Sequence, residues 1–344
     1  MHTIQNTLYV MTPHAYAHLE NATVRIDVEH EKKLQVPLHH IGCLVTFGSI
    51  MVSPALMHRL ADEGKSLVLL DDHGRFKARL EGPVSGNVLL RQAQHTKAGD
   101  GSYALELARH IVAGKLKNSR SVLMRGARET LEIEEVKLLT RATDNLAASL
   151  RAARDAVTLD ELRGVEGEAA RGYFASLNLI VKPQVRDTFV LNGRSRRPPL
   201  DRFNALLSFL YSMLMNDCRS ALEAVGLDPQ IGFLHAIRPG RAALALDLQE
   251  EFRSILADRL ALTLINRGQL TADDFDKREG GAVMLNDKGR RKVVTAWQER
   301  KQEEITHPLT EGKMPLALLP FIQARFMART LRNEMESYLP YLHK

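Results

Sequence analysis

The sequence predicts an α+β protein in which a β-rich, sandwich-like N-terminal domain precedes a larger all-α domain. Alternation of apolar and polar residues fills much of the segment before residue 81, whereas helical periodicity dominates after residue 102. The chain has 344 residues, which is more than one hydrophobic core usually serves. We therefore expect a first domain over 1–90, a connector over 91–101 and a helical domain over 102–344.

The N-terminal strands are predicted from side-chain alternation. Residues 23–28 alternate with the period of two that a half-buried strand requires, and residues 33–36 continue this period. Residues 41–47 form a mostly apolar run that also indicates a strand. A short helix is expected over 53–60, because serine is a favoured N-cap and proline a favoured first helical residue.

Turn residues predict a hairpin and the domain junction. Residues 66–70 and 76–80 flank the sequence Asp71-Asp72-His73-Gly74, which is typical of a β-hairpin turn. Glycine, proline and serine then gather at both ends of residues 82–102, which indicates the connector.

Long helices are predicted in the second domain. Residues 201–225 and 247–266 carry leucine and phenylalanine at helical spacing, and Gly268 is suited to cap the second of these helices. Thr158 and Glu161 have the spacing of a capping box, which indicates that another helix begins there.

Composition excludes several classes of protein. Lysine and arginine number 47 against 41 acidic residues, so the formal charge is +6 and the isoelectric point about 9.3, which suits a polyanionic partner. Two distant cysteines indicate a reducing, cytoplasmic setting. The chain lacks a signal-peptide pattern and a long apolar run, so no membrane association is expected. It also lacks the loops typical of nucleotide hydrolases, serine hydrolases and oxidoreductases.

Two segments of the second domain contain candidate chemistry. Glu166 lies among three glycines that would let a ligand approach, although a surface glutamate on a helix packed through glycines is an alternative. His235 ends an apolar run and precedes Arg238 and Arg241, which are suited to binding phosphate. A structural histidine followed by a solvated basic loop is the alternative.

A third segment, residues 246–253, is acidic. Asp247 and Glu250 lie about 60° apart around a helix, on one face and away from the leucine stripe. Glu251 is closer still to Asp247 in angle, so periodicity does not choose between the two glutamates. The alternative is a solvated acidic face on which Glu250 pairs with Arg253.

Together the three segments indicate a metal site. Two or three carboxylates with one imidazole favour Mg²⁺ or Mn²⁺, and the histidine favours Mn²⁺. Zinc is disfavoured because neither HExxH nor CxxC occurs. A metal among arginines would polarise a phosphodiester and neutralise charge in its transition state.

These segments also resemble a known family. EG-x₂-A-x₂-YF from Glu166, GF-x-H ending at His235 and LDLQEEFR from Leu246 occur in the order and with the gaps of the CRISPR-associated spacer-acquisition integrase, CRISPR-associated protein one. The pattern looks like subtype I-C. The resemblance covers nearly the whole chain, because it extends to Val36-Pro37-Leu38, Gly48 with Val52-Ser53, and Asp71-x₂-Gly74-Arg75.

The resemblance implies which residues form the catalytic site of the helical domain. In the family a glutamate, a histidine and an acidic residue hold one divalent metal, and Glu166 and His235 match the first two. Many members have aspartate at the third position, where this chain has Glu250, a longer carboxylate that we expect to preserve ligation. Asp247 is then a catalytic neighbour that acts through water or through a ligand. The glutamates that match no family ligand, and that we expect to be structural, are Glu168 and Glu251.

The resemblance further implies DNA integration by a homodimer. The 3′-hydroxyl of a short duplex would attack a phosphodiester beside a CRISPR repeat, and a companion, CRISPR-associated protein two, would bridge two homodimers. Double-stranded DNA would be held mainly by charge. A non-catalytic DNA-binding scaffold and, less favoured, a small-molecule metallohydrolase are the alternatives. The candidate DNA-binding residues are Arg194, Arg196, Arg197, Arg238 and Arg241, with the run Arg290-Arg291-Lys292.

Overall fold

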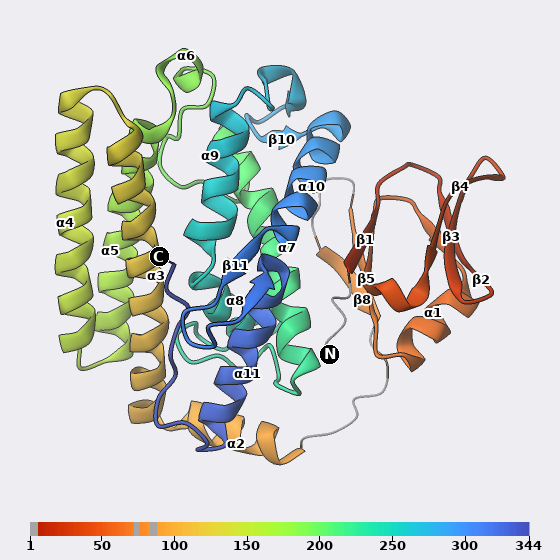
Figure 1. Cartoon of the computed structure of the whole chain (residues 1–344), viewed down its shortest axis with the longest axis horizontal. Coiled ribbons are helices and arrows are strands. Elements are labelled where there is room, and N and C mark those ends of the chain that lie inside the picture. The colour runs from red at the N-terminus through yellow and green to blue at the C-terminus, as the bar shows by residue number, and fades with distance from the viewer. Residues whose placement is uncertain (1–5, 72–75, 81, 83–87, 344) are drawn as a thin grey trace. The chain divides into compact units, whose positions relative to one another are not determined.

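The computed structural model divides the chain into two units, Met1–Gly86 and Asn87–Lys344 (Figure 1). It describes residues 6–71, 76–80, 82 and 88–343. The first unit is built from strands and the second mainly from helices, so the predicted fold class is confirmed.

Two four-stranded sheets build the N-terminal unit. In the first, ordered β1-β5-β7-β8, the first three strands are parallel and β8 is antiparallel to β7. In the second, ordered β4-β3-β2-β6, neighbouring strands are antiparallel except for the parallel pair β2 and β6. The strand bounds are β1 Asn6–Val10, β2 Tyr16–Glu20, β3 Thr23–Val28, β4 Glu31–Pro37, β5 Ile41–Phe47, β6 Met51–Val52, β7 Ser66–Leu70 and β8 Phe76–Leu80.

One hydrophobic core lies between these sheets. Val24 of β3 and Leu44 of β5 are both fully buried in it, together with Leu56 of helix α1, Pro54–Asp62. The Ser53 hydroxyl accepts a hydrogen bond from the Leu56 backbone N–H at 3.2 Å, as an N-cap does. The expected strands over 23–28, 33–36 and 41–47 and the helix from Ser53 are therefore present. The hairpin strands β7 and β8 also pair as expected, whereas its predicted turn residues Asp72, His73 and Gly74 lie outside the described residues.

Helices form most of the second unit. Three long helices, α3, α4 and α5, pack against one another, α8 packs against α3, and α7 packs against α8 (Figure 1). None of the helices within the described residues is long and apolar enough to span a membrane. The helix bounds are α2 Val88–Gly99, α3 Gly101–Glu129, α4 Ile133–Asp155, α5 Leu159–Leu177, α6 Pro183–Arg186, α7 Arg202–Ala224, α8 Ala243–Glu250, α9 Arg259–Asn266, α10 Asp287–Gln302 and α11 Leu319–Leu331.

This unit also contains short strands that the all-α expectation omits. Two antiparallel pairs, β9 with β10 and β11 with β12, lie on either side of α10 in the chain. Each strand has three residues, too few for periodicity to reveal. The strand bounds are β9 Phe275–Lys277, β10 Val283–Leu285, β11 Glu304–Thr306 and β12 Lys313–Pro315.

The expected connector over 91–101 is instead helix α2, and it belongs to the second unit. Gln94 is fully buried, and its side-chain amide donates to the carbonyl oxygens of Asp228 and Ile231 at 2.8 Å each. Glycine at 99 and 101 marks the junction between two helices rather than the edge of a linker. The boundary therefore precedes residue 88, and α2 supports the loop that leads to His235.

Helix α7 agrees with the helix expected over 201–225, but the helix expected over 247–266 differs. It begins at Ala243 and contains a π-helical segment, Arg253–Asp258, between α8 and α9. Such segments re-aim the side chains that follow them. Gly268 has φ +64° and closes α9, as expected.

Candidate active site

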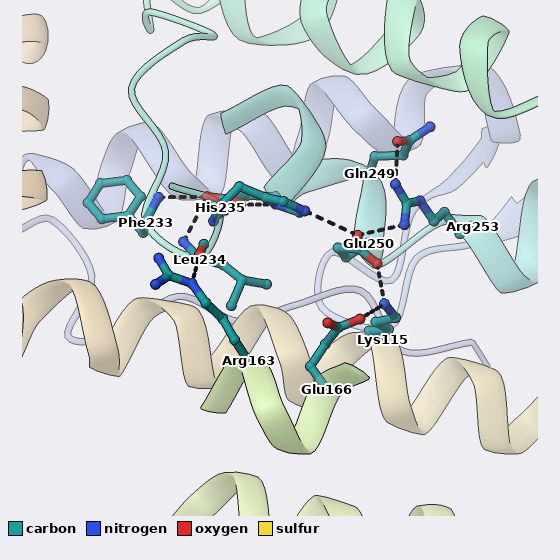
Figure 2. A network of polar contacts seen from close by, with 10 residues as sticks. Lys115, Arg163, Glu166, Phe233, Leu234, His235, Gln249, Glu250 and Arg253 are labelled. Carbon is teal, nitrogen blue, oxygen red and sulfur yellow. Dashed lines mark hydrogen bonds and ion pairs between the residues drawn. The ribbon is translucent and has the colours of Figure 1, made fainter. Parts of the chain in front are cut away.

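Three elements that are distant in sequence meet at the candidate site (Figure 2). Helix α5 carries Glu166, the loop before α8 carries His235, and α8 carries Glu250. Arg163 of α5 joins the first two, because its Nε donates to the Leu234 carbonyl at 2.7 Å. The three predicted metal ligands therefore lie on neighbouring elements.

Local sequence explains how α5 and the loop are placed. The Thr158 hydroxyl accepts the Glu161 N–H at 3.2 Å, as the N-cap of a capping box does. The return bond differs, because Glu161 Oε2 accepts the Val157 N–H at 2.8 Å rather than the N–H of Thr158. Gly232 lets the loop approach α8, because a Cβ there would lie 2.7 Å from Asp247 Oδ2 and from the Ala243 carbonyl carbon.

Asp247 organises this loop. It is fully buried, and its carboxylate accepts the backbone N–H groups of Phe233, Leu234 and His235 at 2.6, 3.1 and 2.9 Å. Its Oδ1 also lies 2.6 Å from His235 Nδ1. Because a carboxylate accepts, Nδ1 carries a proton, and Nε2 is the ring nitrogen that faces Glu250. Asp247 thus orients the imidazole, and its own oxygens are occupied.

Glu250 lies at the centre of the charged groups. Its side chain is 2% exposed, and Oε1 contacts Arg253 Nη1 at 2.7 Å and lies 3.8 Å from His235 Nε2. Oε2 lies 2.7 Å from Lys115 Nζ. Burial would raise the pKa of Glu250, but the positive charges of Arg253 and Lys115 outweigh burial and lower it. Glu250 is therefore ionised at neutral pH.

Lys115 of α3 lies between the two glutamates. Its Nζ forms ion pairs with Glu166 Oε1 and Glu250 Oε2, and the residue is 9% exposed. Burial would lower the pKa of Lys115, yet the charges of Glu250 and Glu166 outweigh burial and raise it. An ammonium ion therefore occupies the space between Glu166 and Glu250.

The side chains of the site are donors that suit a metal ion, although they are not gathered closely enough to surround one. Within residues 6–71, 76–80, 82 and 88–343, no three histidine, cysteine or acidic side chains are close enough to hold an ion together. Two carboxylates and an imidazole are nevertheless the donors that Mg²⁺ or Mn²⁺ accepts. Glu250 Oε2 makes no well-directed hydrogen bond in the described chain, and Lys115 already brings a positive charge between both carboxylates. The residues fit such an ion.

The structure decides between the readings of the acidic segment. Asp247, Glu250 and Glu251 are all buried, so the solvated acidic face is wrong, although Glu250 does pair with Arg253. Glu251 binds the hydroxyl of Tyr338 and accepts the Tyr341 N–H at 2.8 Å. It therefore fastens the C-terminal segment to the helix, which is a structural role.

Helix α5 is not packed through its glycines. A Cβ at Gly164, Gly167 or Gly172 would have no atom within 4 Å in the described chain, apart from its chain neighbours and the nearby backbone of α5 itself. The Glu166 side chain is 23% exposed, and Glu168 pairs with Arg171 on the surface. The sides of α5 that carry these glycines are therefore open.

The candidate DNA-binding residues separate into exposed and internal groups. Arg196, Arg197 and Arg238 are exposed, and Arg241 is half-buried. Arg194 faces inward, where its guanidinium donates to Asn204 Oδ1 at 2.7 Å and lies 5.3 Å from the Tyr211 ring. This places Arg194 outside the set available to DNA.

The basic run Arg290-Arg291-Lys292 is likewise divided. Arg290 is 8% exposed and pairs with Asp287. Lys292 pairs with Asp274 at 2.7 Å. Arg291 is exposed. The run therefore contributes one exposed cation rather than a patch.

Two features of the site have no motif in the sequence. Lys115 is four residues after Ile111 and four before Ser119, so it lies on the buried stripe of α3. A charged residue on a buried stripe is the sequence signal that would have identified it. A cavity of about 20 Å³ beside it is lined by Lys115, Tyr173, Tyr211, Glu250 and Asp258. No local spacing relates these cavity residues.

Comparison with known proteins gives consistent similarities. A family model described as CRISPR associated protein Cas1 matches residues 8–299. The CRISPR-associated endonuclease Cas1 1 of Moorella thermoacetica is 53% identical over 344 residues, covering 100% of both chains.

Two solved structures share the fold. A casposase bound to integration product matches with TM-score 0.83 and 22% identity, over 98% of this chain and 94% of that one. A chain of a Cas6-RT-Cas1–Cas2 complex matches with TM-score 0.84 and 23% identity, over 100% of this chain and 37% of that one. At these identities, similarity of structure concerns the fold alone.

Proposed function

The chain belongs to the family of CRISPR-associated protein Cas1, and we propose that it is a divalent-metal-dependent DNA integrase and endonuclease of CRISPR adaptation. It would join the 3′-hydroxyl ends of short duplex DNA to a CRISPR repeat. The observation that carries this proposal is that Glu166 and Glu250 share one cation, with His235 Nε2 3.8 Å from Glu250.

The reaction would be a transesterification. The attacking 3′-oxygen forms a bond to phosphorus and loses its proton, while the bond from phosphorus to the host 3′-oxygen breaks and that oxygen gains a proton. One phosphodiester replaces another, so no nucleotide is consumed, which agrees with the lack of a Walker-type loop. Cleavage of branched DNA would use the same site in reverse or with water.

The contacts of each site residue indicate its role in the proposed reaction. Glu166, His235 through Nε2, and Glu250 would hold Mg²⁺ or Mn²⁺, and Asp247 would keep the imidazole in the correct tautomer and orientation. When bound, the ion would polarise the phosphodiester and stabilise charge in the transition state. Arg253 holds Glu250 in place at 2.7 Å. Arg238, exposed and three residues beyond His235, would bind a phosphate of the duplex.

The assembly proposed is a homodimer with duplex DNA and a companion protein, Cas2. The fold shared with a chain of a Cas6-RT-Cas1–Cas2 complex supports this part of the proposal. Subtype I-C remains a proposal based on the sequence pattern. Cys43 and Cys218 form no disulfide in the described part of the chain, which suits the reducing cytoplasm where a chromosomal repeat would be found.

Strand joining with separated variants tests the proposal. A supercoiled plasmid that carries a CRISPR repeat is incubated with a labelled duplex, with and without Cas2, in Mn²⁺ or in EDTA. We expect joined product in Mn²⁺, none in EDTA, and at least a hundredfold loss in Glu166→Gln. Glu168→Gln, an exposed glutamate on the same helix, is the matched control and should retain wild-type joining.

A duplex that ends in a 3′-dideoxynucleotide should not join, because it lacks the attacking oxygen. Joined product in EDTA, or undiminished joining by Glu166→Gln, would contradict the proposed chemistry. DNA binding without any joining under all conditions would favour the non-catalytic scaffold instead.

A further inference from the structure

Lys115 occupies the position between the two carboxylates that the proposed metal would use. Its Nζ is 2.7 Å from Glu250 Oε2 and forms an ion pair with Glu166 Oε1 (Figure 2). A metal ion would lie about 2.1 Å from the same oxygens. Two cations bound to one pair of oxygens would be almost in contact, so the ammonium and the metal compete for the same lone pairs.

The charges around the site favour one such cation at a time. Lys115 pairs with both Glu166 and Glu250, and Arg253 is a second cation on Glu250. Both glutamates therefore already have a positive partner. A divalent ion added beside an unmoved ammonium would meet a like charge in a buried space, where repulsion is strong. Withdrawal of Lys115 removes this repulsion.

The structure provides space for that withdrawal. A small cavity of about 20 Å³, enough for one group the size of a water molecule or an ammonium, has Lys115 on its wall, together with Tyr173, Tyr211 and Asp258. The carboxylate of Asp258 is 1% exposed and lies in this wall, so the cavity contains an acidic group as well as room. A lysine has four rotatable side-chain bonds, and its ammonium can move while α3 stays in place.

We propose that Lys115 is an internal counter-ion that holds Glu166 and Glu250 together in the metal-free protein and is displaced when the metal binds. The inference rests on the proposed function, because it assumes that these glutamates bind a divalent ion. Lys115 then sets the metal affinity by competition, and it spares the metal-free fold the repulsion of two facing carboxylates.

Metal affinity measured without any DNA tests this inference. Mn²⁺ is titrated calorimetrically into wild type, Lys115→Met and the matched control Lys117→Met, an exposed lysine on the same helix. Without the competing ammonium, Lys115→Met should bind Mn²⁺ at least tenfold more tightly, unfold at a lower temperature in EDTA, and gain more thermal stability from Mn²⁺ than wild type. Lys117→Met should match wild type. Unchanged or weaker binding by Lys115→Met would overturn the inference.

A second variant keeps the test decisive if Lys115→Met does not fold. Lys115→Arg retains the charge and offers two-pronged hydrogen bonds to carboxylates, so it should be harder to displace and should weaken Mn²⁺ binding several-fold. Equal or tighter binding would contradict competition. If wild type shows no Mn²⁺ binding that Glu166→Gln abolishes, the proposed metal site itself fails; if it does, and Lys115→Met binds no tighter, only the role of Lys115 fails.

Discussion

The carboxylate of Asp258 lies in the π-helical segment between two tyrosines. Tyr211 donates to Oδ1 at 2.6 Å and Tyr173 to Oδ2 at 2.9 Å. Burial raises the pKa of Asp258 from 3.8 to about 6, and the two hydroxyl donors only partly oppose this increase. The folded protein therefore binds this proton more tightly than the unfolded chain does.

This pKa predicts a pH dependence of stability. Because the folded-state pKa is raised, the contribution of Asp258 to stability is complete below about pH 4 and is lost as pH rises through about 6. A shift from 3.8 to about 6 corresponds to about 3 kcal/mol. Between pH 4 and pH 7.5, the free energy of unfolding should therefore fall by about that amount more in wild type than in Asp258→Asn, measured by urea titration.

The comparison between variants removes the effect of the other titrating groups, which both proteins share. Glu168→Gln, on the surface of α5, should change with pH as wild type does. A difference between wild type and Asp258→Asn that is constant across this pH range would show that Asp258 does not titrate there.

At the scale of elements, glycines have opposite roles in α5 and in the loop before α8. The three α5 glycines contact nothing where a Cβ would be, so they weaken the helix without easing any contact in the described chain. Gly232, in contrast, lies against the backbone of α8 and under the Asp247 carboxylate. The first kind lies on open sides of α5, and the second lets the loop that carries His235 approach α8.

These roles predict opposite effects of adding one methyl group. Gly167→Ala should stabilise the protein by about 1 kcal/mol, because alanine is the better helix former and meets no atom. Gly232→Ala should destabilise it, because the new Cβ would lie 2.7 Å from backbone. Urea unfolding measures both. Destabilisation by Gly167→Ala would mean that the α5 surface is not open.

At the scale of the whole molecule, the formal charge is +6. Some of the basic side chains are exposed, and others bind groups of their own chain. Arg196, Arg197 and Arg238 are exposed, whereas Arg194 and Arg290 bind groups of their own chain. Exposed cations release counterions from DNA when they contact phosphate, and internal ones do not. The sequence-wide charge therefore overstates the surface available to a duplex.

The exposed arginines predict the salt dependence of DNA binding. Duplex affinity should fall linearly with salt on logarithmic axes, and Arg238→Ala should reduce the slope by about one. Arg151→Ala, an exposed arginine on α4 outside the candidate set, serves as the control and should leave the slope unchanged. Fluorescence anisotropy at several salt concentrations measures these slopes. An unchanged slope in Arg238→Ala would exclude a phosphate contact by that residue.

The amino-acid sequence by itself determined the fold class and the chemical types of the candidate site. Strand and helix periods differ, so β3 and α7 were predictable from residues close together in the chain. Glu166, His235 and Glu250 could be selected as candidates because each lies in a short motif. The order and spacing of such motifs can be read from the sequence without knowing which residues are in contact. Glu251 was expected to be structural, and its contacts with Tyr338 and Tyr341 agree.

Tertiary structure alone decided which charges face one another. Lys115 is separated from Glu166 by 51 residues, and no local pattern reports a contact over such a distance. The same is true of α2, whose Gln94 holds a loop 134 residues away and so turns an expected connector into a supporting helix. Periodicity indicates which face of a helix is buried, but it does not indicate which neighbour covers that face. Tertiary packing decides whether a carboxylate contacts water, an arginine or a lysine.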